Sequence, residues 1–264
     1  MGKVWMFASG KGGVGKSSVS AGLAVAFAKR GMRTLIVDSD IGLRNLDLML
    51  GMQDKVLFEL SDCLEKRCTL EEAMVAHPNY PSLYLLVGGQ SAKPGDFGAG
   101  QLTRIFTTIR KYFDIVLVDC PAGLGRGFRN MLAVADDSIL IATPDDVCLR
   151  DTQKTAQMIF DKAALSPYLI LNRYDAASFN NGSIQTPEGI AANMDMTLLG
   201  SVPNDTRIYS AMMQGLSMAE CGSEKVTQAV GNIASRMRGQ DIPFENYLQS
   251  PFRKWLDKWK RGSK

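Results

Sequence analysis

Short apolar runs recur along the chain, and polar or amphipathic stretches separate them. Seven of the runs are apolar nearly throughout and rich in β-branched residues, which is typical of strands buried on both faces of a sheet. We expect strands at Lys3–Ser9, Arg33–Asp38, Leu83–Val87, Phe113–Asp119, Ser138–Thr143, Tyr168–Asn172 and Leu198–Pro203. Apolar residues at helical spacing lie between them and predict helices at Ser17–Arg30, Gln101–Lys111, Asp146–Lys162 and Glu224–Met237.

Alternation of strand and helix predicts an α/β fold, with a mostly parallel sheet of seven or eight strands and helices on both faces. Ligands of such sheets bind beyond the carboxyl ends of the strands. We expect one such domain over residues 1–243, followed by a linker and an amphipathic helix over residues 244–264. Gln90–Gly100 has Gly and Pro at the density of a loop on the same domain.

Charge is distributed unevenly along the 264 residues, although the net charge is only +3. The tail from Phe244 onward carries six Lys/Arg and two Asp/Glu, which makes it +4 and leaves the rest of the chain at −1. This asymmetry indicates an acidic partner for the tail and argues against nucleic-acid binding by the body. The five cysteines are odd in number and lack metal-ligand spacing, so we expect reduced thiols in a cytosolic protein.

A glycine-rich sequence follows the first expected strand directly and leads into the first expected helix. It fits G-x-x-x-x-G-K-[ST] from Gly10 to Ser17. Its glycines allow backbone N–H groups to turn inward onto phosphate oxygens, and the following helix adds the positive end of its dipole. We expect Lys16 to reach the β- and γ-phosphates and the Ser17 hydroxyl to bind Mg²⁺. The expected cradle comprises Gly10, Lys11, Gly12, Gly13, Val14, Gly15, Lys16, Ser17 and Ser18.

Aspartates close two of the expected strands near this cradle. Asp38 and Asp40 have the period-two spacing that places side chains on one face, so both can approach a metal beside the phosphates. Asp119 ends an apolar strand as in a Walker B motif, and Gly123 follows as a hinge. A single aspartate at a strand end is more often a turn or helix cap, but three of them beside a P-loop favour a metal site.

The GKGGVGKS form of the cradle resembles the deviant Walker A motif of the MinD/ParA group of P-loop ATPases. The sequence DSDIGLRNLDLMLG, residues 38–51, is more similar to the MinD branch than to the ParA branch. The resemblance implies a Mg²⁺-dependent ATPase that forms a homodimer with ATP, with Lys11 reaching the partner's nucleotide. It also implies that Asp40 orients the attacking water, that Asp38 and Asp119 belong to the magnesium shell, and that Asn45 lies in the first switch.

The strand at Tyr168–Asn172 runs into Asn-Arg-Tyr-Asp, and by the same resemblance Asn172 would read adenine. Arg173, Pro203 and Asp205 would line the base. Asn-x-x-Asp, from Asn172 to Asp175, is also the spacing with which GTPases read guanine, so the base identity rests on the other motifs, which favour ATP.

The tail has the pattern of an interfacial helix. Ser250 and Pro251 suit the N-cap and the first helical position. An apolar stripe follows, and basic residues flank it, a combination typical of helices that lie on anionic membranes. The stripe is Phe252, Trp255, Leu256 and Trp259, and the basic residues include Lys254 and Lys258. A helix docked on the body is the alternative.

The MinD branch implies a spatial regulator of septum placement in cell division, cytoplasmic and peripheral on the inner membrane face when ATP is bound. A MinC-like inhibitor and a MinE-like regulator would be its partners, at Arg150 and Asp151. Alternatives are a flagellum-positioning relative, which usually has an N-terminal extension before its first strand, and a ParA-type DNA-partitioning ATPase. His77, the single histidine, is expected in a surface loop.

Overall fold

The computed structural model describes residues 1–39, 45–89, 98–121, 123–180, 182 and 184–245. These residues form an eight-stranded sheet of order β3-β4-β2-β5-β1-β6-β7-β8. All neighbouring strands are parallel except the edge strand β3, which pairs antiparallel with β4. The strands are β1 (Lys3–Ala8), β2 (Thr34–Asp38), β3 (Val75–Ala76), β4 (Leu83–Val87), β5 (Ile115–Asp119), β6 (Asp137–Ala142), β7 (Tyr168–Tyr174) and β8 (Thr197–Pro203).

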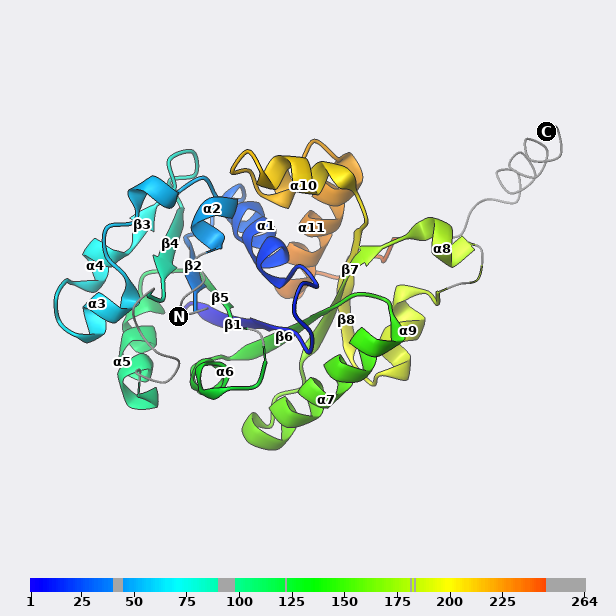
Figure 1. Ribbon diagram of the computed structural model, residues 1–264, viewed down its shortest axis with the longest axis horizontal. Helices are drawn as coiled ribbons and strands as arrows, with labels where there is room; N and C mark the ends of the chain where they lie inside the picture. Colours follow the sequence, from blue (N-terminus) through cyan, green and yellow to red (C-terminus); the bar gives the residue numbers. More distant parts are fainter. Residues whose placement is uncertain (40–44, 90–97, 122, 181, 183, 246–264) are drawn as a thin grey trace.

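Helices cover both faces of the sheet, with α1 and α11 on one face and α5, α6 and α7 on the other (Figure 1). The longer helices are α1 (Lys16–Ala28), α5 (Ala99–Ile109), α7 (Asp146–Ala163) and α11 (Glu224–Met237). The shorter ones are α2 (Leu46–Met49), α3 (Leu60–Leu64), α4 (Leu70–Ala73), α6 (Arg126–Leu132), α8 (Ala176–Asn180), α9 (Pro187–Asn193) and α10 (Thr206–Met212), with 3₁₀ turns η1 (Gln53–Lys55) and η2 (Met218–Glu220).

The central strand β1 shows why the strand sequences are apolar throughout. Trp5 and Phe7 pack into the core on the α1 and α11 side, whereas Val4 and Met6 pack into the core on the other side. All four side chains are at most 2% exposed. A strand with two buried faces needs an apolar side chain at every position, so periodic alternation disappears.

The predicted α/β architecture is confirmed, and every strand and helix predicted within residues 1–243 lies within two residues of an observed one at both ends. Strand β3 was not predicted, because two residues carry no periodicity. The loop expected over Gln90–Gly100 ends earlier than predicted, since α5 begins at Ala99. Residues 90–97 lie outside the described part of the chain.

The prediction that His77 is a surface residue is wrong. His77 follows β3 in a loop, as expected, but its side chain is only 6% exposed. The imidazole Nδ1 accepts a hydrogen bond from the backbone N–H of Asn79 at 3.1 Å, and its ring lies 5.0 Å from that of Tyr80. Burial lowers the pKa of His77, against the opposing effect of the nearby Glu220 carboxylate. A single histidine gives no pattern from which such packing could be predicted.

The described chain ends at Glu245 beside the last helix. Arg236 of α11 donates hydrogen bonds to the carbonyls of Ile242 and Pro243, and its guanidinium lies 4.2 Å from the Phe244 ring. The predicted tail helix falls at residues outside the described part. Among the described helices, none has both the length and the apolar character needed to cross a membrane.

Candidate nucleotide-binding site

The glycine-rich loop connects β1 to α1 at the carboxyl edge of the sheet. Gly13 and Gly15 adopt positive φ angles of 78° and 91°, which the absence of a Cβ makes accessible. Gly15 is the N-cap of α1, a 13-residue helix whose amino end therefore faces the loop. The loop and the helix together direct backbone N–H groups and the positive helix end at one place, as binding of phosphate requires.

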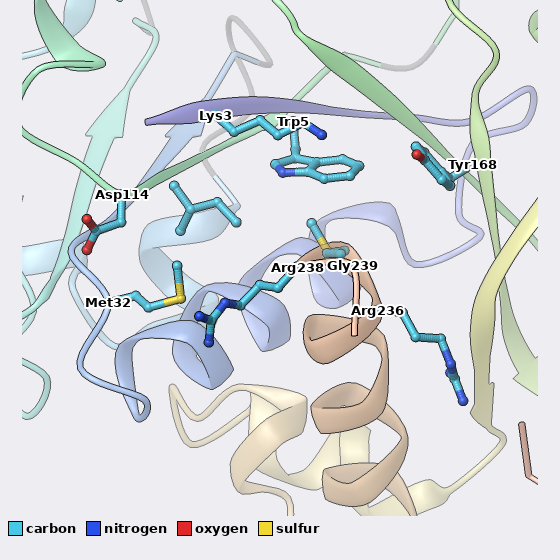
Figure 2. A pocket seen from close by; sticks show the side chains of 10 residues that line it. Lys3, Trp5, Met32, Asp114, Tyr168, Arg236, Arg238 and Gly239 are labelled. Atoms are coloured by element: carbon cyan, nitrogen blue, oxygen red, sulfur yellow. The ribbon is translucent and has the colours of Figure 1, made fainter. Parts of the chain in front are cut away.

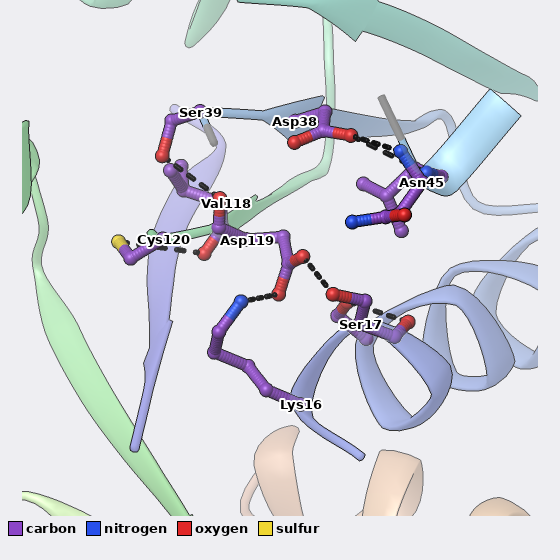
Figure 3. Close-up of polar contacts among 10 residues, drawn as sticks. Lys16, Ser17, Asp38, Ser39, Asn45, Val118, Asp119 and Cys120 are labelled. Carbon is purple, nitrogen blue, oxygen red and sulfur yellow. Dashed lines mark hydrogen bonds and ion pairs between the residues drawn. The ribbon is translucent and has the colours of Figure 1, made fainter. Parts of the chain in front are cut away.

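Lys16, Ser17 and Asp119 meet at this edge (Figure 3). The Lys16 ammonium lies 2.8 Å from Oδ1 of Asp119, and the Ser17 hydroxyl donates to Oδ2 at 2.5 Å. Lys16 is 8% exposed and Asp119 is 1% exposed. Both charges are therefore withdrawn from water and depend on each other and on the hydroxyl for their solvation.

Asp38 contacts the start of α2. Its Oδ2 accepts hydrogen bonds from the backbone N–H groups of Asn45 at 3.2 Å and Leu46 at 3.3 Å, at the start of α2 (Figure 3). The neighbouring Ser39 donates its hydroxyl to the Asp119 carbonyl at 2.8 Å. The ends of β2 and β5 are thereby joined, so Asp38 and Asp119 lie side by side at the sheet edge.

These residues fit a magnesium nucleotide. Mg²⁺ prefers oxygen ligands, and Ser17, Asp38 and Asp119 supply a hydroxyl and two carboxylates next to the cradle. A Cβ built on Gly12 or Gly13 would meet nothing within 4 Å, so the loop presents open backbone at these positions. On binding, the phosphates would replace Asp119 as the partner of the Lys16 ammonium. The metal would replace Asp119 as the partner of the Ser17 hydroxyl and would compensate the negative charge of the Asp119 carboxylate.

Lys11 lies on the exposed side of the loop and faces the start of α7. The pKa of Asp145, the N-cap of α7, is lowered first by the hydrogen bond from the Thr143 hydroxyl, at 2.6 Å, and further by the Lys11 charge. The effect of its charge on Asp145 does not test whether Lys11 reaches the nucleotide of a second subunit, and that role stays a prediction. Asp145 was not singled out from the sequence, although an aspartate just after a strand end is the available signal.

The predicted base-reading Asn172 is 4% exposed and contacts the cradle itself. Its Nδ2 donates to the Val14 carbonyl at 2.8 Å, and a Cβ on Gly15 would lie 2.2 Å from the same nitrogen. The side chain therefore supports the P-loop backbone. Arg173, the next residue, has a φ of 56°, which a non-glycine residue rarely adopts outside sites where the surroundings enforce it. Whether Asn172 also reads adenine stays a prediction.

Asp175, the residue that would read guanine in a GTPase, is already used in a helix cap. Its carboxylate accepts from the Ala177 and Ser178 backbone and from the Ser178 hydroxyl at 2.6 Å. These bonds, the hydroxyl first, lower the pKa of Asp175. A carboxylate with three donors has little capacity left for a base, which favours adenine over guanine at this site.

Pro203 ends β8, and Asp205 follows it as the N-cap of α10. The Asp205 carboxylate accepts from Arg207 at 2.7 Å and from the Ser223 hydroxyl at 2.7 Å. The Arg207 hydrogen bond is the main cause of a strongly lowered pKa at Asp205. Asp205 thus ties α10 to α11, and its predicted place beside the base stays a prediction. Ser18 contacts the same helix through its hydroxyl, 3.5 Å from Sδ of Met212.

Arg150 and Asp151 lie in the second turn of α7, and Asp151 forms an i,i+3 ion pair with Lys154 at 3.4 Å. The backbone of the same turn contacts the cradle, since a Cβ on Gly10 would lie 2.5 Å from the Asp151 carbonyl oxygen. The helix expected to meet regulators therefore packs directly on the P-loop. Asp40 and the predicted membrane residues of the tail lie outside the described residues.

Comparison with known proteins assigns the family. A ParA family model, described as NUBPL iron-transfer P-loop NTPase, matches residues 1–238. The septum site-determining protein MinD of Bacillus subtilis is 32% identical over 247 residues, which are 93% of this chain and 92% of that protein. The chain belongs to the MinD family. The MinD of Synechocystis is also 32% identical, over 251 residues and 94% of each chain.

Solved MinD structures have the same fold. The MinC:MinD cell division complex of Aquifex aeolicus matches with a TM-score of 0.85 and 28% identity, over 93% of this chain and 99% of that one. The Pyrococcus horikoshii MinD complexed with Mg-ADP matches with a TM-score of 0.78 and 31% identity, over 90% of this chain and 96% of that one. Family membership and the cradle geometry together make this chain a P-loop ATPase that uses ATP with Mg²⁺.

Proposed function

We propose that this MinD-family ATPase helps to place the division septum by binding the membrane as an ATP-held dimer and recruiting a division inhibitor there. The observation that carries the proposal is the likeness, over 93% of the chain, to a MinD solved in complex with MinC. The inhibitor would be MinC-like and would meet α7 near Arg150 and Asp151. A MinE-like regulator would act at the same helix.

Dimerisation is the step that ATP controls in this proposal. Lys11 is exposed, while Lys16 is buried against Asp119, from where it would reach the phosphates of its own subunit. A second cation at this position can complete the partner's site and stabilise the charge that develops during phosphoryl transfer. The predicted roles of Asp40, in orienting water, and of Asn45, in the first switch, belong to this step.

Membrane binding rests on the tail sequence. Four large apolar side chains contribute at most about 6–12 kcal/mol on insertion. Ordering some ten backbone residues costs about 1–2 kcal/mol each, so one tail binds marginally. Two tails on one dimer act at high effective concentration and bind far more strongly. Nucleotide-dependent dimerisation would in this way control membrane attachment.

Co-sedimentation with vesicles containing 30% phosphatidylglycerol, in ATP and in ADP, tests the proposal. We expect binding in ATP that falls as salt rises, because screening weakens the cationic contribution. Trp255→Glu should weaken binding at least about tenfold, since it replaces a large apolar side chain that is expected to insert into the membrane. Trp255→Phe is the matched control and should bind nearly as wild type does. Equal binding in both nucleotides would refute control by dimerisation.

Tryptophan fluorescence provides a second readout in the same titration. The chain has three tryptophans, and Trp5 is 2% exposed in the core, so the other two dominate any change of environment. A blue shift in ATP but not in ADP is expected for insertion of Trp255 and Trp259. An unshifted spectrum with bound protein would instead indicate that attachment occurs without insertion of the stripe.

A further inference from the structure

A cavity of about 450 Å³ lies at the amino edge of the sheet, at the opposite end from the P-loop. Its lining includes the first residues of β1, β5 and β7 and the last turn of α11. Trp5 and Tyr168 form an aromatic wall, with ring centroids 5.5 Å apart (Figure 2). The volume is within the range of about 300–1,000 Å³ that small-molecule sites occupy.

Positive charge predominates in the lining of the cavity. Among the described residues that line it, Lys3, Arg236 and Arg238 are cations and Asp114 is the one carboxylate. Asp114 already accepts a hydrogen bond from the Arg33 backbone N–H at 2.8 Å. Lys3 forms an ion pair with Asp137 and lies 4.3 Å above the Trp5 ring. The lining carries more positive than negative charge, and its aromatic wall holds one of the cations in place.

Arg238 differs from the other two cations because its guanidinium has no acceptor among the residues that the structure describes. Arg236 donates to three carbonyls and points away from the cavity, whereas Arg238 extends along it toward Met32 (Figure 2). Within the described part of the chain, the Arg238 side chain makes no hydrogen bond or ion pair, although the backbone N–H of Arg238 donates to the Ser235 carbonyl at 3.0 Å. The guanidinium of Arg30 is near enough to be affected by the Arg238 charge. Among the described residues neither Arg30 nor Arg238 forms an ion pair, and two neighbouring like charges are stabilised when an anion binds between or beside them.

The cavity lies at the root of the tail. Arg236, which lines it, fixes the chain through the carbonyls of Ile242 and Pro243 and through the ring of Phe244. Asn232 adds a hydrogen bond to the Glu245 carboxylate at 3.0 Å. The 19 residues that follow carry the predicted membrane stripe. Membrane attachment through these residues would bring the anchored end of α11, and the cavity with it, close to the lipid surface.

We propose that this cavity is a second membrane contact, in which Arg238 binds the phosphate of an anionic lipid headgroup at the root of the tail. The inference rests on the proposed membrane function and adds a site on the folded body. Headgroup phosphate provides the acceptor that Arg238 lacks, and the aromatic wall and Met32 accommodate the glycerol portion. The carboxyl end of a helix carries partial negative charge, which would repel an anion. At α11 the backbone N–H groups of Gly239 and Gln240 donate hydrogen bonds to the last carbonyls and so weaken this repulsion.

Vesicle binding by full-length protein in ATP tests the site, with 30% phosphatidylglycerol in phosphatidylcholine as the probe. Arg238→Gln should weaken binding about fivefold for each protomer engaged, as expected for one cation at an anionic leaflet. Arg104→Gln is the matched control, because it removes the same charge from an exposed position on α5, in the layer on the other face of the sheet. An equal loss of vesicle affinity in the two variants would mean that net charge alone causes the effect, and it would overturn the proposal. Unchanged melting temperatures would show that both variants fold.

The two proposals fail in different ways. If Trp255→Glu abolishes binding while Arg238→Gln binds as wild type does, the tail function stands and the cavity site is refuted. If Arg238→Gln weakens binding and Trp255→Glu does not, the cavity site stands and the tail stripe is refuted. Absence of binding by the wild-type protein in ATP would refute both.

Trp5 can report on the cavity directly. The double variant Trp255→Phe/Trp259→Phe leaves Trp5 as the single tryptophan, beneath the Lys3 ammonium. Its emission should change on addition of phosphatidylglycerol vesicles, and the change should disappear when Arg238→Gln is added. A response to soluble glycerol 1-phosphate but not to vesicles would assign the cavity to free phosphate esters and overturn the lipid assignment. No response to either probe would refute the site.

Discussion

At Asp119 two donors converge on one buried carboxylate, and both of these contacts have to be replaced when Mg-ATP binds. The ammonium of Lys16 and the hydroxyl of Ser17 each occupy one oxygen of a side chain that is 1% exposed. A buried charge without a partner costs several kcal/mol. Binding of Mg-ATP must therefore replace each of these contacts as it breaks them, with phosphate for the ammonium and metal for the carboxylate. Nucleotide without the metal would leave Asp119 uncompensated.

The buried His77 leads to a prediction about how the stability of the fold depends on pH. Burial keeps its pKa below the ordinary value of 6.5, so the unfolded chain takes up a proton at a higher pH than the folded protein does. Stability is then full above pH 6.5 and falls as the pH drops from 6.5 toward the folded pKa, by at most about 1.4 kcal/mol per pH unit. Urea unfolding between pH 7.5 and 5 measures this slope.

The chain contains one histidine, so a single substitution removes all histidine titration. His77→Gln removes the titration and should flatten the slope between pH 6.5 and 5, even if it lowers stability throughout. The lowered pKa of Glu220 acts below the ordinary glutamate value of 4.5 and does not enter this window. A variant with the wild-type slope would assign the pH dependence to another group.

Contact between two elements, the P-loop and α7, determines which glycines the cradle needs. At Gly10 the loop backbone lies so close to α7 that a Cβ would be 2.4 Å from the Asp151 carbonyl carbon and 2.6 Å from the Thr152 nitrogen. Backbone atoms cannot move aside as a flexible side chain can. The helix that is proposed to meet regulators therefore touches the loop that binds phosphate, and a displacement of one must be accommodated by the other.

Gly10→Ala should accordingly destabilise the nucleotide-free protein by about 1–3 kcal/mol, the usual cost of overpacking. Gly12→Ala is the matched control in the same loop, since a Cβ there meets nothing within 4 Å. Its stability should stay within about 0.5 kcal/mol of wild type. Denaturant unfolding without nucleotide separates the two. Similar losses in both variants would mean that the cost comes from loop conformation and not from contact with α7.

Periodicity and motif spacing predicted the elements that obey them. The buried strands and the long helices, such as α7 and α11, could be located because many residues repeat one pattern. Strand β3, with two residues, and the helices of four or five residues carry too few positions to show a period. In the site, Lys16 and Asp119 could be predicted from motifs and do meet. The burial of His77 depends on tertiary packing, which local sequence does not encode. The capping roles of Asp145 and Asp205 had a local signal, an aspartate directly before a helix, and only the contact of Asp205 with Ser223 depends on tertiary packing.

At the scale of the whole molecule, the two ends of the sheet carry different tasks. The nucleotide residues follow the carboxyl ends of β1, β2 and β5, whereas the cavity of Figure 2, and Arg236 with the carbonyls that it binds, lie at the amino end. If the proposed dimer forms across the carboxyl edge, residues 242–245, where the tail begins, would lie away from the interface. In the proposed function, such a separation would allow ATP to control membrane binding through the number of tails joined, without any change in the tail itself.

Lys11→Ala tests the dimer on which this control depends. The variant should bind ATP as a monomer with nearly wild-type affinity, because Lys16 and the backbone of the cradle hold the phosphates. The ATP-dependent dimer should weaken at least about thirtyfold, since a charge-assisted contact across an interface contributes about 2–5 kcal/mol. Light scattering at increasing protein concentration, with ATP and with ADP, measures the change.

Lys162→Ala, which removes an exposed cation from the last turn of α7, is the control and should dimerise as wild type does. An intact ATP dimer in Lys11→Ala would refute the role of this lysine across the interface. Loss of ATP binding by the monomer would instead place Lys11 in its own subunit's site.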